Sequence, residues 1–234
     1  MSHENHPRMK TTFEKLAAQA ATLREEHAQA HGGVFDIYEF AKEQGVTHVH
    51  HIGEKINIWA TDDNNQEWGC NIPECHKQDT ARFLLAVLVG WVILRDKDSP
   101  NSFYAYDPID VLIQEELFIQ RKSSEEIRAE LFAYYLMVPE YALADTSITS
   151  LYNTASSQRF MDAVSDGKDS IATELGVPPI IVANYAGLRW GLHQAKKQEE
   201  LRNEQREAME AARRSRLDTY SSSSRTRRRN KWSY

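Results

Sequence analysis

The feature that most constrains this chain is an apolar run of twelve residues, 83–94, which contains no charged side chain. A helix that crosses a bilayer needs about 20 apolar residues, so this run is too short for that role and is typical of a buried helix. Extended back to Thr80, the helix is apolar on every side, which predicts a position at the centre of a domain. A chain of 234 residues, 41% of them hydrophobic, can bury one such core.

The spacing of apolar residues elsewhere predicts an α+β fold, mostly helical, with one small sheet. Asp36 is placed to cap one helix, and Ser123 followed by Glu126 predicts a capping box at the start of another. Strand-like alternation on both sides of a turn at 62–65 predicts an antiparallel sheet. The expected helices are 12–31, 36–44, 80–94, 123–137, 156–164 and a two-helix unit at 170–193, and the expected strands are 46–52, 56–60 and 68–72.

Three segments, in order along the chain, carry a family resemblance. Residues 82–91 read Arg-Phe-Leu-Leu-Ala-Val-Leu-Val-Gly-Trp, and residues 130–139 read Glu-Leu-Phe-Ala-Tyr-Tyr-Leu-Met-Val-Pro. Residues 175–179 read Leu-Gly-Val-Pro-Pro, followed by Tyr-Ala-Gly-Leu at 185–188. The first resembles the Arg-Phe-x-x-Ala-His-Glu-x-Gly-His segment of the bacterial ImmA/IrrE zinc peptidases. The second is similar to that family's Asn-x-Phe-Ala-x-x-Leu-Met-Pro segment with one extra residue, and the third to its closing helices. The resemblance implies a zincin-like domain.

The residues that would hold and use zinc are replaced in this chain. By the resemblance, Val87 and Trp91 stand where the family has two histidines, and Leu88 stands where it has a glutamate. In such enzymes the histidines bind the metal and the glutamate takes a proton from the metal-bound water. Valine, leucine and tryptophan offer no lone pair and no titratable group. The resemblance therefore implies a pseudo-peptidase with a degenerate HExxH motif, no enzyme activity, no zinc or other cofactor, and a filled pocket.

Three acidic residues, Glu125, Glu126 and Glu130, lie in the region of the family's third zinc ligand. None of them can hold a metal alone once the histidines are absent. Glu126 is better explained as the partner of Ser123 in the capping box.

For function, the resemblance implies gene regulation. Active members of the family relieve repression by cutting a helix-turn-helix repressor, and they are commonly encoded on phages and mobile elements. We therefore expect a non-catalytic transcription regulator that binds a repressor-type protein partner without cutting it. No secretory signal is visible and no apolar run is long enough to span a bilayer, so we expect a cytoplasmic protein without a membrane partner.

Charge divides the chain into an acidic body and a basic end. Residues 194–234 carry a net charge of +6 and the remainder carries −12. We expect an N-terminal helix at 1–33, the pseudo-peptidase domain at 34–193, and a charged helix and tail at 194–234 that is disordered from residue 221. Basic segments of this kind bind nucleic acid or acidic protein surfaces electrostatically, or serve only as a solubilising, disordered end. The alternative function is therefore a nucleic-acid-binding regulator. The candidate contacts are Arg213, Arg214, Arg216, Arg225, Arg227, Arg228, Arg229 and Lys231.

Residues 170–190 have the pattern of a helix-turn-helix unit, with Gly176 at the turn. In its second helix only Asn184 and Arg189 offer groups for bases or phosphates, and the acidic body repels a phosphate backbone. We therefore favour packing of these helices inside the domain, and base reading by this unit belongs to the alternative function.

His27 and His31 lie four residues apart, a spacing that lets one helix present two ligands to a metal ion. No third ligand is evident from the sequence around them. We interpret the two histidines as solvent-facing residues that complement the dipole at the C-terminus of their helix.

A second set of metal-ligand types surrounds the predicted strands but matches no strong zinc pattern. We expect Cys70 to point inward from a strand and Cys75 to lie in a loop. The other members of this set are His48, His50, His51 and His76.

Overall fold

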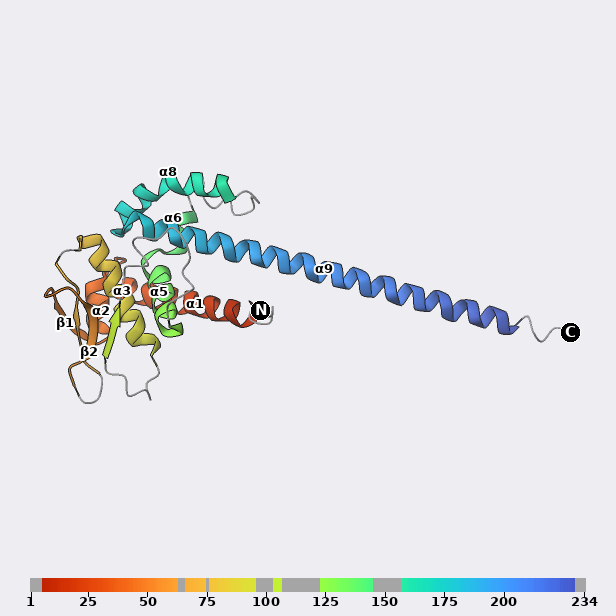
Figure 1. Ribbon diagram of the computed structural model, residues 1–234, viewed down its shortest axis with the longest axis horizontal. Helices are drawn as coiled ribbons and strands as arrows, with labels where there is room; N and C mark the ends of the chain where they lie inside the picture. The colour runs from red at the N-terminus through yellow and green to blue at the C-terminus, as the bar shows by residue number, and fades with distance from the viewer. Residues whose placement is uncertain are drawn as a thin grey trace. The chain divides into compact units, whose positions relative to one another are not determined.

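The computed structural model of the chain describes residues 6–62, 66–74, 76–95, 103–106, 123–144 and 157–229 (Figure 1). The chain divides into two compact units, Met1–Leu188 and Arg189–Tyr234. The first expected helix, which we had set apart as residues 1–33, belongs to the first of these units. The predicted α+β class is confirmed, because the structure is mostly helical and contains one small sheet.

Two helices of the first unit begin at the caps that the sequence predicts. Asp36 accepts a hydrogen bond from the backbone N–H of Tyr38 at 2.8 Å. Ser123 and Glu126 form the predicted capping box, with the Glu126 N–H donating to the Ser123 hydroxyl and the Ser123 N–H donating to the Glu126 carboxylate. The helices that lie within the first unit are α1 (His6–Ala30), α2 (Ile37–Glu43), α3 (Gln78–Leu94), α5 (Ser124–Met137), α6 (Glu140–Ala144) and α8 (Ser157–Leu175).

The sheet has the strand order β1-β3-β2-β4, with β1 (Val46–His50), β2 (Ile56–Ala60), β3 (Trp68–Asn71) and β4 (Phe103–Tyr106). β2 pairs antiparallel with both β3 and β4, but β1 pairs parallel with β3. The expectation of a purely antiparallel sheet is therefore wrong. The strands on either side of residues 62–65, β2 and β3, do form an antiparallel pair, but β3 also lies next to β1 and runs parallel to it. All four residues of β3 are buried, as a central strand requires.

The core lies between the sheet and the helices α2, α3 and α5 (Figure 1). α3 is in contact with β2, α2 and α5. The α3 residues from Phe83 to Trp91 are all buried, which confirms the prediction of a central apolar helix. α1 packs against α5, and it buries Leu16 and Ala20 there. Near its end, Arg24 donates to the backbone carbonyl of Leu136 at 2.5 Å, which ties α1 to the end of α5.

The C-terminal helices are longer than expected. α8 is continuous through Gly167, where we had expected separate helices at 156–164 and from 170 onward. A turn at Gly176, with φ of +63°, leads to α9 (Pro179–Arg229), which begins in the first unit and forms the described part of the second. The expected disorder from residue 221 is not what the structure has, because α9 continues to Arg229. Extending an existing helix costs far less free energy than starting a new one.

No single helix in the described ranges is both long and apolar enough to cross a membrane. The segments Gln158–Leu175 and Pro179–Arg214 meet those two criteria only when they are taken together.

Candidate functional site

The segment that resembles a zinc-binding helix lies in the middle of α3. Val87 and Leu88 have no exposed surface, and Trp91 is 3% exposed. The structure thus places the side chains of Val87, Leu88 and Trp91 in the core.

Aromatic side chains from the sheet surround Trp91. Its ring stacks on Tyr104 of β4, with centroids 5.0 Å apart and an interplanar angle of 8°, and it meets Trp68 of β3 edge-to-face at 5.6 Å. The guanidinium of Arg95 lies 4.4 Å from the Trp68 ring centroid. Aromatic pairs of this geometry add about 0.5–1.5 kcal/mol each beyond the burial of their area. Trp91 therefore links α3 to two strands.

A buried acid lies on the neighbouring helix. Glu130 of α5 has no exposed surface, which is rare for a glutamate. Burial raises the pKa of Tyr104, and the carboxylates of Glu126 and Glu130 raise it further. Burial likewise raises the pKa of Tyr134, with a smaller contribution from Glu130. The charge of Glu130 therefore acts on the hydroxyl groups of both tyrosines. By the resemblance, Glu130 lies in the region of the family's third zinc ligand, but nothing in the sequence indicated that its side chain is buried.

Gly90 brings α3 and α5 close together. A Cβ atom at this position would lie 3.0 Å from the backbone oxygen of Ala129 and 3.0 Å from Cδ1 of Phe132. The glycine that fits the family's zinc segment thus has a packing role here that requires no metal.

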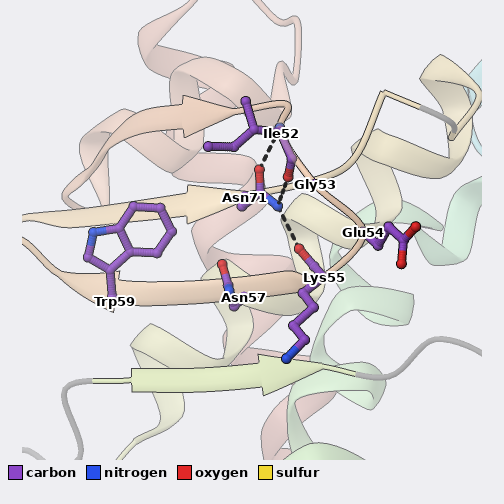
Figure 2. A pocket seen from close by; sticks show the side chains of 7 residues that line it. All are labelled: Ile52, Gly53, Glu54, Lys55, Asn57, Trp59 and Asn71. Atoms are coloured by element: carbon purple, nitrogen blue, oxygen red, sulfur yellow. Dashed lines mark hydrogen bonds between the residues drawn. The ribbon is translucent and has the colours of Figure 1, made fainter.

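An open groove of about 540 Å³ lies on the sheet beside the loop that joins β1 and β2 (Figure 2). Asn71 of β3 holds this loop: its side-chain oxygen accepts from the Ile52 N–H at 2.8 Å, and its amide donates to the carbonyls of Ile52 and Lys55, both at 2.6 Å. The groove is lined by Ile52, Gly53, Glu54, Lys55, Asn57, Trp59 and Asn71.

Two features of the groove suit a ligand. Ile52 is 70% exposed, although it is a large aliphatic residue. The side-chain oxygen of Asn57 is buried and has no hydrogen-bond partner among the described residues. Trp59 lies against Gly69 of β3, where a Cβ atom would come within 2.8 Å of the indole ring. The groove therefore combines an apolar wall with an unused acceptor. Sequence reasoning missed it, because a loop and two strands form it together.

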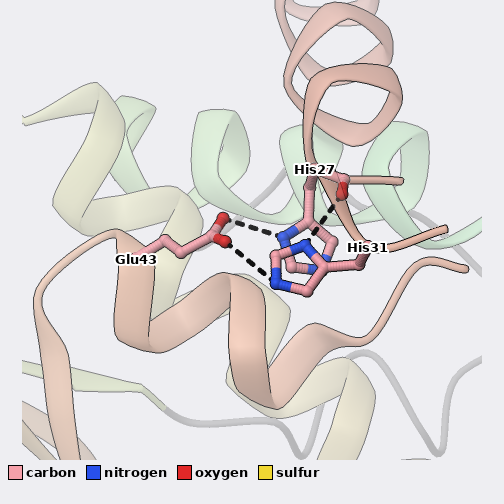
Figure 3. Close-up of side chains that lie close together, drawn as sticks. All are labelled: His27, His31 and Glu43. Carbon is pink, nitrogen blue, oxygen red and sulfur yellow. Dashed lines mark hydrogen bonds and ion pairs between the residues drawn. The ribbon is translucent and has the colours of Figure 1, made fainter. Parts of the chain in front are cut away.

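The histidines of α1 differ from the sequence-based interpretation (Figure 3). His27 is 3% exposed, so it is not solvent-facing. Glu43 at the end of α2 supplies the third ligand type that was not evident: its carboxylate lies 2.8 Å from Nδ1 of His27 and 3.5 Å from Nε2 of His31. His31 does bond a carbonyl at the end of its helix, since its Nδ1 lies 3.0 Å from the His27 oxygen.

In the described part of the chain, the cysteine and histidines around the strands do not form a group of three that could share a metal ion. Cys70 is fully buried in β3, as predicted, and burial raises its pKa to about 12, so the thiol is unreactive. His50 stacks on Trp59, and the Nδ1 of His51 lies 2.8 Å from the Ile72 carbonyl. Among the described residues, His27, His31 and Glu43 form the group that could hold a metal ion, and Cys75 lies outside those residues.

The helix-turn-helix-like segment is folded into the core of the first unit. Ile181, Val182 and Ala186 at the start of α9 have no exposed surface. Asn184, one of the two groups considered for base contacts, donates from its amide to the Tyr134 hydroxyl at 3.2 Å. This face of the helix is therefore occupied by α5.

The basic candidates lie along α9. Arg213 and Arg214 are exposed, and Arg214 lies 3.8 Å from Glu210 one turn earlier. The structure continues the α9 backbone through the positions of Arg216, Arg225, Arg227, Arg228 and Arg229, and Lys231 lies outside the described residues.

No protein-family model matches the chain, and no curated protein matches it significantly.

Proposed function

We propose that this chain is a non-catalytic regulatory protein that binds a protein partner without cutting it, on a scaffold like that of the ImmA/IrrE peptidases. The observation that carries the proposal is the burial of the middle of α3. Val87, Leu88 and Trp91 are all buried there among apolar side chains. A zinc peptidase needs nitrogen ligands and a general base that substrate can reach at these positions. Alkyl and indole groups in a closed core stabilise the fold instead.

Glu130 also supports a scaffold like that of the ImmA/IrrE peptidases. By the resemblance, an acidic residue of the later helix is a zinc ligand in active relatives. Glu130 is fully buried on α5, and its charge contributes to raising the pKa of Tyr104, whose ring stacks on Trp91. Fully buried glutamates are rare, so an acidic residue retained in this part of the core fits a scaffold that descends from a metal site.

Charge indicates the kind of partner. The residues outside 194–234 carry a net charge of −12. DNA-binding proteins carry a basic face, and complementary potentials speed their encounter with an acidic protein. A helix-turn-helix repressor, of the kind found on phages and mobile elements, offers such a face. Binding that face would compete with the phosphate backbone of an operator and so relieve repression without cleavage.

The groove beside the β1–β2 loop is the surface that we assign to this partner. Ile52 and Trp59 offer apolar contact, and Glu54 and Lys55 line the groove beside them with charged side chains. Buried aliphatic and aromatic anchors of this kind carry most of the binding energy in protein interfaces.

The first experiment is a pull-down of the tagged full chain from its source cells, with and without nuclease. A basic helix-turn-helix protein that remains after nuclease supports the proposal. The partner is then purified, and its intact mass is followed during incubation with the chain and Zn²⁺. Cleavage of the partner would overturn the non-catalytic assignment.

A matched pair of variants tests the groove. Ile52→Glu adds a charge in the groove, and Val34→Glu adds the same charge at another exposed aliphatic residue, since the two are 70% and 65% exposed. We expect Ile52→Glu to raise the Kd for the purified partner at least tenfold, about 1.4 kcal/mol, and Val34→Glu to change it little. Equal effects of the two would exclude the groove.

The basic clusters of the C-terminal region favour a second candidate, a nucleic-acid-binding regulator. Residues 194–234 carry +6, and five of the candidate arginines lie at or beyond Arg216. If this function holds, removing residues 221–234 abolishes binding of labelled duplex DNA, and the affinity of the full chain falls steeply with salt. Binding that survives the truncation would exclude the tail as the contact.

A further inference from the structure

The three side chains His27, His31 and Glu43 come from two helices that meet at an angle (Figure 3). His27 is in the last turn of α1, His31 follows its end, and Glu43 closes α2. One ligand atom from each lies within 4.8 Å of the others. The His27 and His31 rings stack with centroids 4.2 Å apart. The site is distant in sequence from the α3 motif and independent of the function proposed above.

The contacts of His31 favour a cation in this cluster. Its Nδ1 lies 3.0 Å from the His27 carbonyl, which can only accept, so this nitrogen carries a hydrogen. In the neutral ring the other nitrogen, Nε2, is then a bare lone pair. It faces a carboxylate oxygen of Glu43 at 3.5 Å, and that oxygen also only accepts. Two acceptors face each other favourably only with a positive charge between them: a proton on Nε2 or a metal ion.

The dimensions of the cluster suit a metal ion. Zinc binds His nitrogen and carboxylate oxygen at about 2.0–2.2 Å, so tetrahedral ligand atoms lie about 3.4 Å apart. Oε2 of Glu43 lies 2.8 Å from Nδ1 of His27 and Oε1 of Glu43 lies 3.5 Å from Nε2 of His31, so the carboxylate faces both rings at separations of this order. Metal binding at Nδ1 of His27 would release the hydrogen that this nitrogen now donates to Glu43 into solvent.

The surroundings of the cluster hold one ligand in place and leave the others accessible. The His27 side chain is 1% exposed, and its ring packs edge-on against Phe35 and Phe40 at 5.4 and 5.6 Å. The side chains of His31 and Glu43 are 41% and 42% exposed. A hydrogen bond from the second ring nitrogen to a carbonyl, which His31 has, is the usual way that a metal-binding histidine is oriented. The exposed side leaves room for a water molecule as the fourth ligand.

We propose that His27, His31 and Glu43 bind one divalent transition-metal ion, of which Zn²⁺ is the fitting example, with water at the fourth position. The bound ion joins the end of α1 to the end of α2. α1 otherwise lies on α5 through Leu16, Ala20 and the Arg24–Leu136 contact, so the ion adds a second point of attachment for this helix. Ligands that bind only the folded state raise its stability, so Zn²⁺ stabilises the fold.

Zinc titration of the full chain tests the proposal. The protein is stripped with a chelator, and Zn²⁺ is added against a chromogenic competitor to obtain stoichiometry and Kd. The test variants are His31→Ala and Glu43→Gln, which leave buried His27 in place. The matched controls are His48→Ala, an exposed histidine of β1, and Glu39→Gln, an exposed glutamate of α2 that bonds Lys42. Circular dichroism checks that each variant is folded.

The expected result is one tightly bound Zn²⁺ per chain, with Kd raised at least tenfold in His31→Ala and in Glu43→Gln and unchanged in the two controls. Co²⁺ should give the intense visible bands of a four-coordinate site in the parent chain and not in the test variants. Zn²⁺ should raise the Tm of the parent and of both controls only. The proposal is overturned if no stoichiometric ion binds, if both test variants bind as the parent does, or if His48→Ala loses the ion equally.

Discussion

Trp91 contributes the largest side chain to the contact between α3 and the sheet, where it touches Trp68 and Tyr104. Replacing it by alanine leaves a cavity that neighbouring helices and strands cannot fill. We predict that Trp91→Ala lowers the free energy of unfolding by about 3–5 kcal/mol, measured by urea denaturation. Ile52→Ala, a truncation at a 70% exposed position, is the control and should stay within about 0.5 kcal/mol of the parent. If Trp91→Ala lowered the free energy of unfolding by an equally small amount, Trp91 would not be part of a closely packed core.

Two helical glycines provide an internally controlled test of packing. An added methyl group at Gly90 meets the Ala129 carbonyl and the Phe132 ring at 3.0 Å, whereas at Gly187 nothing lies within 4 Å. Alanine favours a helix over glycine by about 1 kcal/mol, so Gly187→Ala should stabilise the protein by up to that amount. Gly90→Ala should destabilise it by about 1–3 kcal/mol through overpacking. Thermal denaturation of both variants gives the comparison, and a stabilised Gly90→Ala would show that α5 can move away.

At the scale of the element, the start of α5 depends on its capping box. Ser123→Ala removes the acceptor for the Glu126 N–H, so it should cost about 1 kcal/mol of unfolding free energy. Ser124→Ala, one position later and exposed, is the matched control and should have almost no effect. Chemical denaturation distinguishes the two variants. Equal effects would mean that the Glu126 N–H bonds water as favourably as it bonds the Ser123 hydroxyl.

Local patterns predicted the elements better than their pairing. Caps and apolar periodicity located α2, α3 and α5, because those signals lie within the element itself. The parallel pairing of β1 with β3 and the strand β4 were missed, since both depend on segments that meet only in the folded chain. The helices expected at 156–164 and from 170 onward are one helix, α8, because helix propensity on both sides of Gly167 outweighs the cost of a glycine.

The same distinction applies to the candidate sites. Val87 and Trp91 could be predicted as core residues from the apolar run alone. The histidine pair was visible as a spacing, but Glu43 lies 16 residues from His27 and joins it only through the turn between α1 and α2. The groove was beyond sequence reasoning for the same reason. A metal or binding site assembled from separate elements carries no local signature.

At the scale of the whole molecule, the buried residues are concentrated in one unit. The last buried apolar residues in the described part of the chain are Tyr185 and Ala186. We predict that a chain ending at residue 195 keeps the unfolding transition of the first unit, with Tm shifted by less than about 4 °C. A chain ending at residue 180 also loses Ile181 and Val182 and should not fold cooperatively. Loss of the transition in the longer truncation would show that the second unit is needed for folding.

The aromatic stack at the centre of the first unit gives the protein an optical signature. Trp68 is 1% exposed and Trp91 3% exposed, and Trp91 lies parallel to Tyr104 at a centroid distance of 5.0 Å. Rings held rigidly at this separation couple their electronic transitions and give a near-ultraviolet circular dichroism signal. That signal is lost when side-chain packing loosens, even where helices persist. Trp68, Trp91 and Tyr104 therefore report, without any added label, whether the interior is closed.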